Sequence, residues 1–341
     1  MAAANEDLSV LVIAEAGVNH NGDVSIAREL VRIAAWSGAD YVKFQTFVPK
    51  LVVTPDAARA EYQKSKDVKD DNTQLALIQN LCLSFEDFKI LKEDCEKYSI
   101  GFMSTAFDLD SLVFLDGIGV ELHKIPSGEI TNLPYLRAIA AFGKPVLMST
   151  GMANLDEIGA AIEVLCSSGL SSEMITILHC TTQYPAQLSG VNLKALDLIA
   201  NTFGLPVGYS DHTSGTEVSV AAVGRGATVI EKHFTLDRTM VGPDHAASLE
   251  PEELARLVAE VRNVSVALGK AEKLPTEAEV EIKPIVRRSI VASRDIERGE
   301  IFSEENLAAK RPGTGLSPMF WDDVIGRPAK RFFRCNELIE L

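Results

Sequence analysis

Eight short apolar runs, each followed by a longer stretch, are the feature that most restricts the fold of this chain. Between Val10 and Leu268 the runs are VLVIAE (10–15), YVKFQ (41–45), GFMST (101–105), LHKIPS (122–127), PVLMST (145–150), ITILHC (175–180), PVGYS (206–210) and TVIEKH (228–233). Continuous apolar runs of this length are typical of parallel strands that are buried on both faces. About eight strand–helix units therefore predict an α/β fold, the (β/α)8 TIM barrel, rather than an open sheet.

The stretches between these runs carry the sequence signals of helix ends. Apolar residues recur at helical spacing from Asp23 to Trp36 and stop before Gly38. Ser84 opens the pattern SFED, which is a capping box, and Asn154 with Glu157 forms a similar start. The last barrel helix is expected from Pro251 to Leu268, with Gly269 at its end.

A long polar connection, Pro49–Asn80, follows the second run. It lies after a strand and therefore on the face where barrel active sites form. Connections of this length without a clear element are usually functional or inserted. We expect a lid or a loop that contacts the substrate.

The pattern changes near Gly269. Residues 1–270 are predicted to form the barrel, and the charged segment 271–284, which contains Pro275 and Pro284, is predicted to be a linker. Residues 285–341 read as short strands and turns. A segment of this size is marginal as an independent fold, so we expect it to dock on its own barrel or on a partner subunit.

Composition excludes several function classes. The 341 residues are 46% hydrophobic and 24% charged, as in an ordinary globular protein. A formal net charge of −15 argues against nucleic acid as a partner, although a local basic pocket can still bind an anion. No apolar run approaches the length of a membrane span, and the N-terminal residues lack the pattern of a signal peptide. Five scattered cysteines without metal-type spacing favour a reducing cytoplasm.

Polar side chains follow the apolar runs at the points where the strands are expected to end. In a barrel these ends converge on one pocket. The candidates are Glu15, Lys43, Gln45, Thr105, Lys124, Ser127, Glu129, Ser149, Thr182, Tyr184, Ser210, Asp211, His212, Lys232 and His233.

This set has a chemical logic. Lysines and serines supply the charged and hydroxyl donors that a phosphate or a carboxylate requires. His212 and His233 end neighbouring strands and could share a divalent metal of the Mn, Fe, Co or Zn type, acting as a Lewis acid on a carbonyl oxygen. Glu15 and Glu129 are candidates for acid–base chemistry or hydroxyl binding.

The ordered motifs resemble one family. AEAGVNHNGD, VKFQTF, KIPSGEITN, STGM, YSDHTSG, EKHFTLD and GPDHAASLEP are similar to motifs of the sialic acid synthases, which include N-acetylneuraminate and legionaminic acid synthases. RRSIVASRDIERGEIFSEENLAAKRPG resembles the small antifreeze-like (SAF) domain of that family. The resemblance covers nearly the whole chain and implies a TIM barrel followed by an SAF domain.

The resemblance also implies roles for individual residues. By the resemblance, His212 and His233 bind the metal, Mn²⁺ or Mg²⁺. Phosphoenolpyruvate falls to Lys43, Thr105, Lys124, Ser127, Ser149 and Ser210, with Thr182 standing where some members carry an asparagine on its carboxylate. The sugar falls to Glu15, Gln45, Tyr184 and Asp244, and Glu129 matches a carboxylate near the reacting carbons. A loop asparagine of some members has only Asn72 as a candidate match.

The implied reaction is an aldol-type condensation. Phosphoenolpyruvate attacks the metal-polarised aldehyde of an open-chain amino sugar, water adds to the second carbon, and phosphate leaves. The main interpretation is an N-acetylneuraminate synthase acting on N-acetylmannosamine. The alternatives are the same condensation on another sugar, giving legionaminic acid, the deaminated nonulosonate or a 9-phosphate, and a non-catalytic glycan- or ice-binding protein. The resemblance also implies a domain-swapped homodimer in which Arg311 enters the partner's site.

Overall fold

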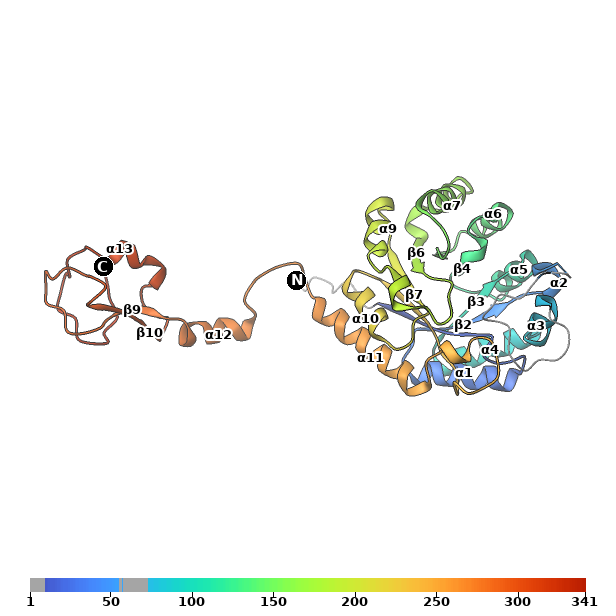
Figure 1. Ribbon diagram of the computed structural model, residues 1–341, viewed down its shortest axis with the longest axis horizontal. Helices are drawn as coiled ribbons and strands as arrows, with labels where there is room; N and C mark the ends of the chain where they lie inside the picture. Colours follow the sequence, from blue (N-terminus) through green and yellow to red (C-terminus); the bar gives the residue numbers. More distant parts are fainter. Residues whose placement is uncertain (1–9, 55–56, 58–72) are drawn as a thin grey trace. The chain divides into compact units, whose positions relative to one another are not determined.

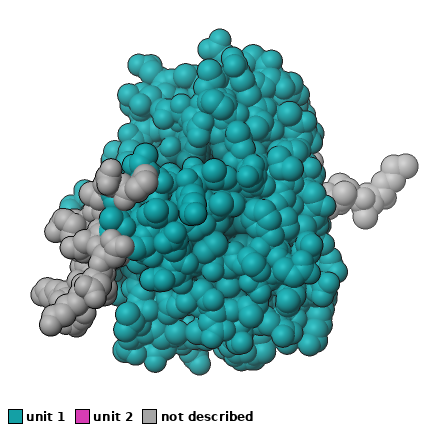
Figure 2. All heavy atoms as spheres, turned by 90° about the vertical axis from the view of Figure 1, so that its right-hand side faces the viewer, with its two compact units in different colours: residues 1–269 teal, residues 270–341 magenta. Residues whose placement is uncertain are grey.

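The computed structural model describes residues 10–54, 57 and 73–341. The chain divides into two compact units, Met1–Gly269 and Lys270–Leu341 (Figure 1). The described atoms of the first unit form a closely packed body (Figure 2). Within the described ranges, no helix has both the length and the apolar character needed to cross a membrane. All five cysteines are free thiols.

The first unit is a closed barrel of eight parallel strands, which confirms the predicted fold class. The barrel closes because β1 pairs with β8 as well as with β2, for example Val12 with Ile230 and Ala14 with Val42. The strands are β1 (Leu11–Gly17), β2 (Tyr41–Thr46), β3 (Gly101–Ala106), β4 (His123–Ile125), β5 (Val146–Ser149), β6 (Ile175–Cys180), β7 (Val207–Asp211) and β8 (Val229–His233).

Helices connect the strands around the barrel (Figure 1). The helices of the first unit are α1 (Val24–Trp36), α2 (Pro49–Val52), α3 (Gln74–Asn80), α4 (Phe85–Tyr98), α5 (Leu109–Gly117), α6 (Leu133–Ala141), α7 (Leu155–Ser167), α8 (Leu188–Val191), α9 (Ala195–Phe203), α10 (Glu217–Gly224) and α11 (Pro251–Leu268). The two predicted capping boxes are present, Ser84 with Asp87 and Asn154 with Glu157. They explain why α4 and α7 start where the sequence predicts.

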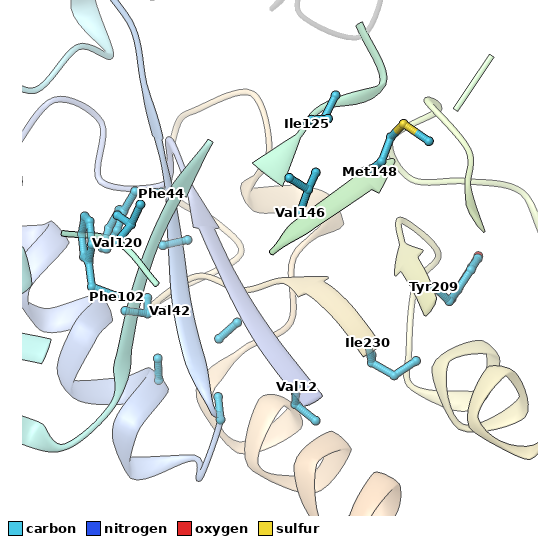
Figure 3. Packing of buried hydrophobic residues seen from close by; sticks show 14 of the residues in the cluster. Val12, Val42, Phe44, Phe102, Val120, Ile125, Val146, Met148, Tyr209 and Ile230 are labelled. Carbon is cyan, nitrogen blue, oxygen red and sulfur yellow. The ribbon is translucent and has the colours of Figure 1, made fainter. Parts of the chain in front are cut away.

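Alternation along each strand divides the core into two layers. Residues such as Val12, Phe44 and Ile230 are fully buried and point from the strands toward the helices (Figure 3). The opposite faces fill the barrel interior with Ile13, Met103, Leu147, Leu178 and Val229. A side chain two positions beyond an interior residue points to the same side of its strand. The next inward-facing residue on each strand therefore lies at the carboxyl end of the barrel.

The second unit has its own small core. It contains α12 (Glu277–Val286), β9 (Ser289–Ala292), β10 (Leu307–Lys310) and α13 (Trp321–Val324). The buried cluster includes Ile290, Phe302 and Phe333, and β9 pairs antiparallel with β10. The segment 271–284, for which we expected a linker, includes most of α12. A capping box of Thr276 and Glu279 starts this helix, and Gly313 N–H donates to the carbonyl of Pro284 at 2.7 Å.

Candidate active site

A cavity of about 530 Å³ opens at the carboxyl ends of the barrel strands. Thirteen predicted site residues line it together: Glu15, Lys43, Gln45, Thr105, Lys124, Ser127, Ser149, Thr182, Tyr184, Ser210, His212, His233 and Asp244. They come from every strand end, because inward-facing positions at the end of a parallel barrel share one volume.

Four buried charges form the centre of this cavity. Lys43 Nζ lies 2.7 Å from Glu15 Oε2 and 3.6 Å from Glu231 Oε2. Lys124 Nζ lies 3.2 Å from Glu231 Oε1. Each of the four residues is at most 5% exposed. Buried charges of this kind are tolerated only when each has a partner, so the two lysines and two glutamates depend on one another. We call these four residues the charge cluster.

Hydroxyl groups complete the charge cluster. Lys43 Nζ donates to Thr105 Oγ1 at 3.0 Å, and Ser210 Oγ donates to Glu231 Oε1 at 3.0 Å. Ser149 Oγ is buried and has no hydrogen-bond partner within the described ranges. An unpaired buried hydroxyl in a cavity of lysines is a ready donor for a bound anion.

The two carboxylates of the cluster differ in their acidity. Burial and the nearby charge of Glu231 raise the pKa of Glu15 to about 7, although Lys43 opposes the rise. Burial alone would also raise the pKa of Glu231, but Lys124 and Lys43 outweigh it and hold that pKa at about 2. At neutral pH, Glu231 is a fixed anion, whereas Glu15 exchanges a proton. Two nearby carboxylates with separated pKa values are typical of acid–base sites.

Two histidines stand beside the charge cluster. The ring centroids of His212 and His233 are 5.6 Å apart, and Tyr184 packs against His212 with ring centroids 4.1 Å apart and ring planes tilted by 33°. Burial lowers the pKa of His212 to about 4 and also lowers that of His233 well below its usual value. Both rings are therefore neutral at pH 7.

The histidine pair fits a divalent cation. His212 Nδ1–H donates to the carbonyl of Thr181, which leaves Nε2 as the free lone pair of that ring. The buried Nδ1 of His233 has no hydrogen-bond partner in the part of the chain that the structure describes. In the same described part, no third His, Cys, Asp or Glu joins these two in a metal-type cluster. The remaining ligands would have to come from substrate or water, as at an open catalytic site.

Glycine allows the neighbouring groups to approach one another. Gly17 has φ of 52°, and a Cβ there would lie 3.2 Å from His233 Cε1 and 3.2 Å from Glu15 Oε1. Gln45 Nε2 lies 3.5 Å from Glu15 Oε1 on the same side. Because Gly17 has no side chain, both His233 and Glu15 can lie close to its backbone.

Asp244 is the remaining acidic group of the cavity wall. It is 8% exposed, and burial raises its pKa to about 6. Its carbonyl accepts a hydrogen bond from Ser248 Oγ at 2.7 Å, which fixes the backbone of this loop. The carboxyl group lines the cavity and carries a proton that it can lose near neutral pH.

Among the predicted site residues of the first unit, Glu129, Asp211 and Lys232 do not line the cavity. Glu129 lies in a 3₁₀ turn, and its Oε2 accepts from Asn132 Nδ2 at 2.5 Å, so the carboxylate is held at the start of α6 and does not line the cavity. Arg311 is exposed in the second unit, where its Nε donates to the carbonyl of Val286. Asn72 lies outside the described residues.

Glu231 is a charged residue of the cavity wall that sequence reasoning missed. It lies between Val229 and His233 on the inward face of β8. Strict alternation of VIEKH would have indicated this, because Glu231 and His233 must share a face. Lys232, which the sequence offered as a strand-end candidate, points to the other side and pairs with Asp211 at 2.9 Å.

Comparison with known proteins agrees with this geometry. The profile of the NeuB family matches residues 30–273, and that of the SAF domain matches residues 287–340. The chain belongs to the NeuB family. This result confirms the resemblance to sialic acid synthases and the interpretation as a transferase-type synthase.

Individual members of the NeuB family are close in sequence and in fold. The chain is 50% identical over 329 residues to the N,N'-diacetyllegionaminic acid synthase of Campylobacter jejuni, with 96% of this chain and 98% of that protein covered. It is 47% identical over 321 residues to the corresponding synthase of Legionella pneumophila, with coverage of 94% and 90%. The crystal structure of N-acetylneuraminic acid synthetase from Leptospira borgpetersenii, in complex with citrate, aligns with a TM-score of 0.71 and 34% identity over 80% of this chain and 90% of that one. The two legionaminic acid synthases, which are more similar in sequence than the Leptospira protein, favour the alternative of another acceptor sugar over the main interpretation, N-acetylmannosamine.

The charge cluster predicts a large stability loss on removal of Glu231. Glu231→Gln keeps the shape and the contact with Ser210 but leaves Lys124 buried without its carboxylate. We expect a loss of about 3–5 kcal/mol in the free energy of unfolding, measured by chemical denaturation at pH 7.

The matched control is Glu29→Gln, which removes an exposed carboxylate that pairs with Arg32 in the same helix. Its loss should stay below about 0.5 kcal/mol. Equal losses for the two variants would show that Glu231 does not hold the cluster together.

Proposed function

We propose that this chain condenses phosphoenolpyruvate with the open-chain aldehyde of an amino sugar, releasing phosphate and a nonulosonic acid. We propose further that the acceptor is a diacetamido-trideoxy sugar, so that the product is of the N,N'-diacetyllegionaminic acid type. The observation that carries the reaction is one buried cavity in which two lysines face two neutral histidines. The choice of acceptor is supported by the names of the two relatives that are 50% and 47% identical.

Phosphoenolpyruvate fits the lysine side of the cavity. Its phosphate and carboxylate need several donors, and Lys43, Lys124, Ser127, Ser149 and Ser210 face the same volume. Gly151 lies beside these groups, where its N–H donates to Ser127 Oγ at 2.9 Å and a Cβ would clash with the same oxygen. Held donors of this kind orient the anion before reaction and reduce the entropic cost of bringing two substrates together.

The acceptor aldehyde fits the histidine side. His212 and His233 would hold a divalent cation, Mn²⁺ or Mg²⁺ by the resemblance. When bound, such an ion supplies Lewis-acid polarisation to a carbonyl oxygen. Tyr184 packs against His212 and fixes the orientation of its ring. Gln45 and Asp244 lie on the wall beside this position and can hydrogen-bond the sugar hydroxyls.

Glu15 is placed to move the proton. It lies between Lys43 and the histidine side, and its pKa of about 7 lets it hold or release a proton at neutral pH. In the condensation the aldehyde oxygen gains a proton and the added water loses one. We propose that Glu15 serves this exchange, while Glu231 stays ionised and keeps both lysines charged.

The reaction is tested with the full chain, phosphoenolpyruvate and Mn²⁺ against a panel of acceptors, by following phosphate release. We expect release with the diacetamido-trideoxy sugar and a kcat/KM at least about tenfold lower with N-acetylmannosamine. Omitting the acceptor or chelating the metal should abolish release.

His212→Ala should also abolish phosphate release while leaving the fold intact. Absence of phosphate release with every acceptor would reject the condensation. A preference for N-acetylmannosamine would keep the condensation and reject the proposed acceptor.

The second unit is proposed to complete a partner's site in a swapped homodimer. This proposal rests on the resemblance and on Arg311, which is exposed and free to present part of its guanidinium. The apolar side chains of α12, among them Val280 and Ile285, are exposed within the described residues and would be covered in such a dimer.

Mixing two inactive variants tests the swap. His212→Ala and Arg311→Ala should each be inactive, but a swapped heterodimer has one site with both groups intact. After subunit exchange between equal amounts, we expect activity near a quarter of the wild-type value, about one site in four. Activity that stays absent although subunits exchange would show that Arg311 acts on its own barrel or on none.

A further inference from the structure

One side of the active-site cavity is apolar and takes no part in the roles described above. This side includes six side chains that pack together: Val18, Phe47, Leu77, Ile78, Leu81 and Phe107. Val18, Phe47 and Phe107 follow β1, β2 and β3, Leu77 and Ile78 belong to α3, and Leu81 follows that helix. We call them the apolar shelf.

The apolar shelf is a packed surface. Phe47 and Phe107 meet edge to face with ring centroids 6.3 Å apart. Val18, Phe47 and Leu81 are 5–8% exposed and form its base. Leu77 and Ile78 are only partly buried and line the open cavity from α3. The Thr73 hydroxyl accepts from Ala76 N–H and caps α3, so the two side chains are presented from a defined helix.

The apolar shelf lies on the acceptor's side of the cavity. Val18 follows Gly17, where an added Cβ would lie 3.2 Å from both His233 Cε1 and Glu15 Oε1. Phe47 lies two residues after Gln45, whose Nε2 is 3.5 Å from Glu15 Oε1 and which lines the same cavity. A sugar whose aldehyde carbon meets the histidine pair therefore extends its remaining carbons over the shelf, while phosphoenolpyruvate occupies the lysine side.

The shelf discriminates between acceptors because its apolar side chains offer no hydrogen-bond partner to a polar group. A hydroxyl pressed against six apolar side chains loses its hydrogen bonds to water without replacement, whereas a methyl group gains contact. Each methyl-sized difference in such a pocket changes kcat/KM by roughly 10–200-fold. An acceptor with a methyl at its terminal carbon and a second acetamido methyl would thus be preferred over one with a terminal hydroxymethyl group.

We propose that the apolar shelf is the specificity-determining element of this enzyme and binds the methyl-bearing end of a deoxygenated, doubly acetamido-substituted sugar. The proposal rests on the proposed condensation and identifies the residues that choose its acceptor. Leu77 and Ile78 are the central residues, because they are the shelf members on α3 that face the cavity without forming its buried base.

The wild-type chain gives the first test without any substitution. Two acceptors are compared that differ only in having a methyl or a hydroxymethyl group at the terminal carbon. We expect kcat/KM at least about tenfold higher for the methyl compound, with the KM for phosphoenolpyruvate unchanged. Equal kcat/KM values, or a preference for the hydroxymethyl compound, would overturn the shelf proposal while leaving the condensation established.

Substitutions then locate the preference. Leu77→Gln and Ile78→Thr should each reduce the ratio of the two kcat/KM values by about tenfold, mainly through the methyl compound. Leu198→Gln on α9 is the matched control, since Leu198 is 53% exposed and does not line the cavity. Its ratio should equal that of the wild type.

Thermal unfolding of each variant checks that the fold is retained. A ratio that stays at the wild-type value in both folded shelf variants would overturn the assignment. If the wild type condenses neither acceptor, the proposed condensation fails as well, which separates that outcome from a failure of the shelf alone.

Discussion

Two lysines and two glutamates share one buried volume at the mouth of the barrel, and the rest of the site depends on their mutual neutralisation. Lys43 contacts both carboxylates, and Lys124 contacts Glu231. None of the four charges could be buried alone, because the cost of removing an ion from water exceeds what an apolar wall returns. A trianionic substrate entering this volume competes with the glutamates for the lysines. Glu15 can relieve this competition, because its pKa of about 7 allows it to take up a proton and become neutral.

The alternation of side chains along each strand determines which residues reach the active site. The interior residues Ile13, Leu147 and Val229 fill the barrel, and the next inward positions on the same strands are Glu15, Ser149 and Glu231. Shifting a strand by one residue would exchange these with side chains that face the helices, such as Lys232. The apolar shelf adds the only large non-polar wall that the described part of this cavity presents, so the site combines an anion-binding half with a half that prefers methyl groups.

The barrel and most of the cavity lining could be predicted from the sequence, because they depend on the hydrophobic pattern of the strands and on the polar residues at the strand ends. Continuous apolar runs predicted the barrel, polar residues at their ends predicted twelve side chains of the cavity, and the family resemblance added Asp244. Glu231 was not predicted, because the polar residues at the end of IEKH were interpreted without the strict alternation that places Glu231 and His233 on one face. Glu129 does not line the cavity, because a 3₁₀ turn, which breaks the strand period, directs it to Asn132. Its catalytic role stays a prediction. The shelf could not be predicted, since α3 meets β1 and β3 only through tertiary packing.

Proton uptake on binding phosphoenolpyruvate tests the central claim most directly. Titration calorimetry of the full chain at pH 7.5, in two buffers of different ionisation enthalpy, gives the number of protons that each binding event takes up. The added negative charge should raise the pKa of Glu15 further, so we predict uptake of a fraction of a proton per site in the wild type and none in Glu15→Gln. Binding without proton uptake in the wild type, or equal uptake in Glu15→Gln, would contradict the account.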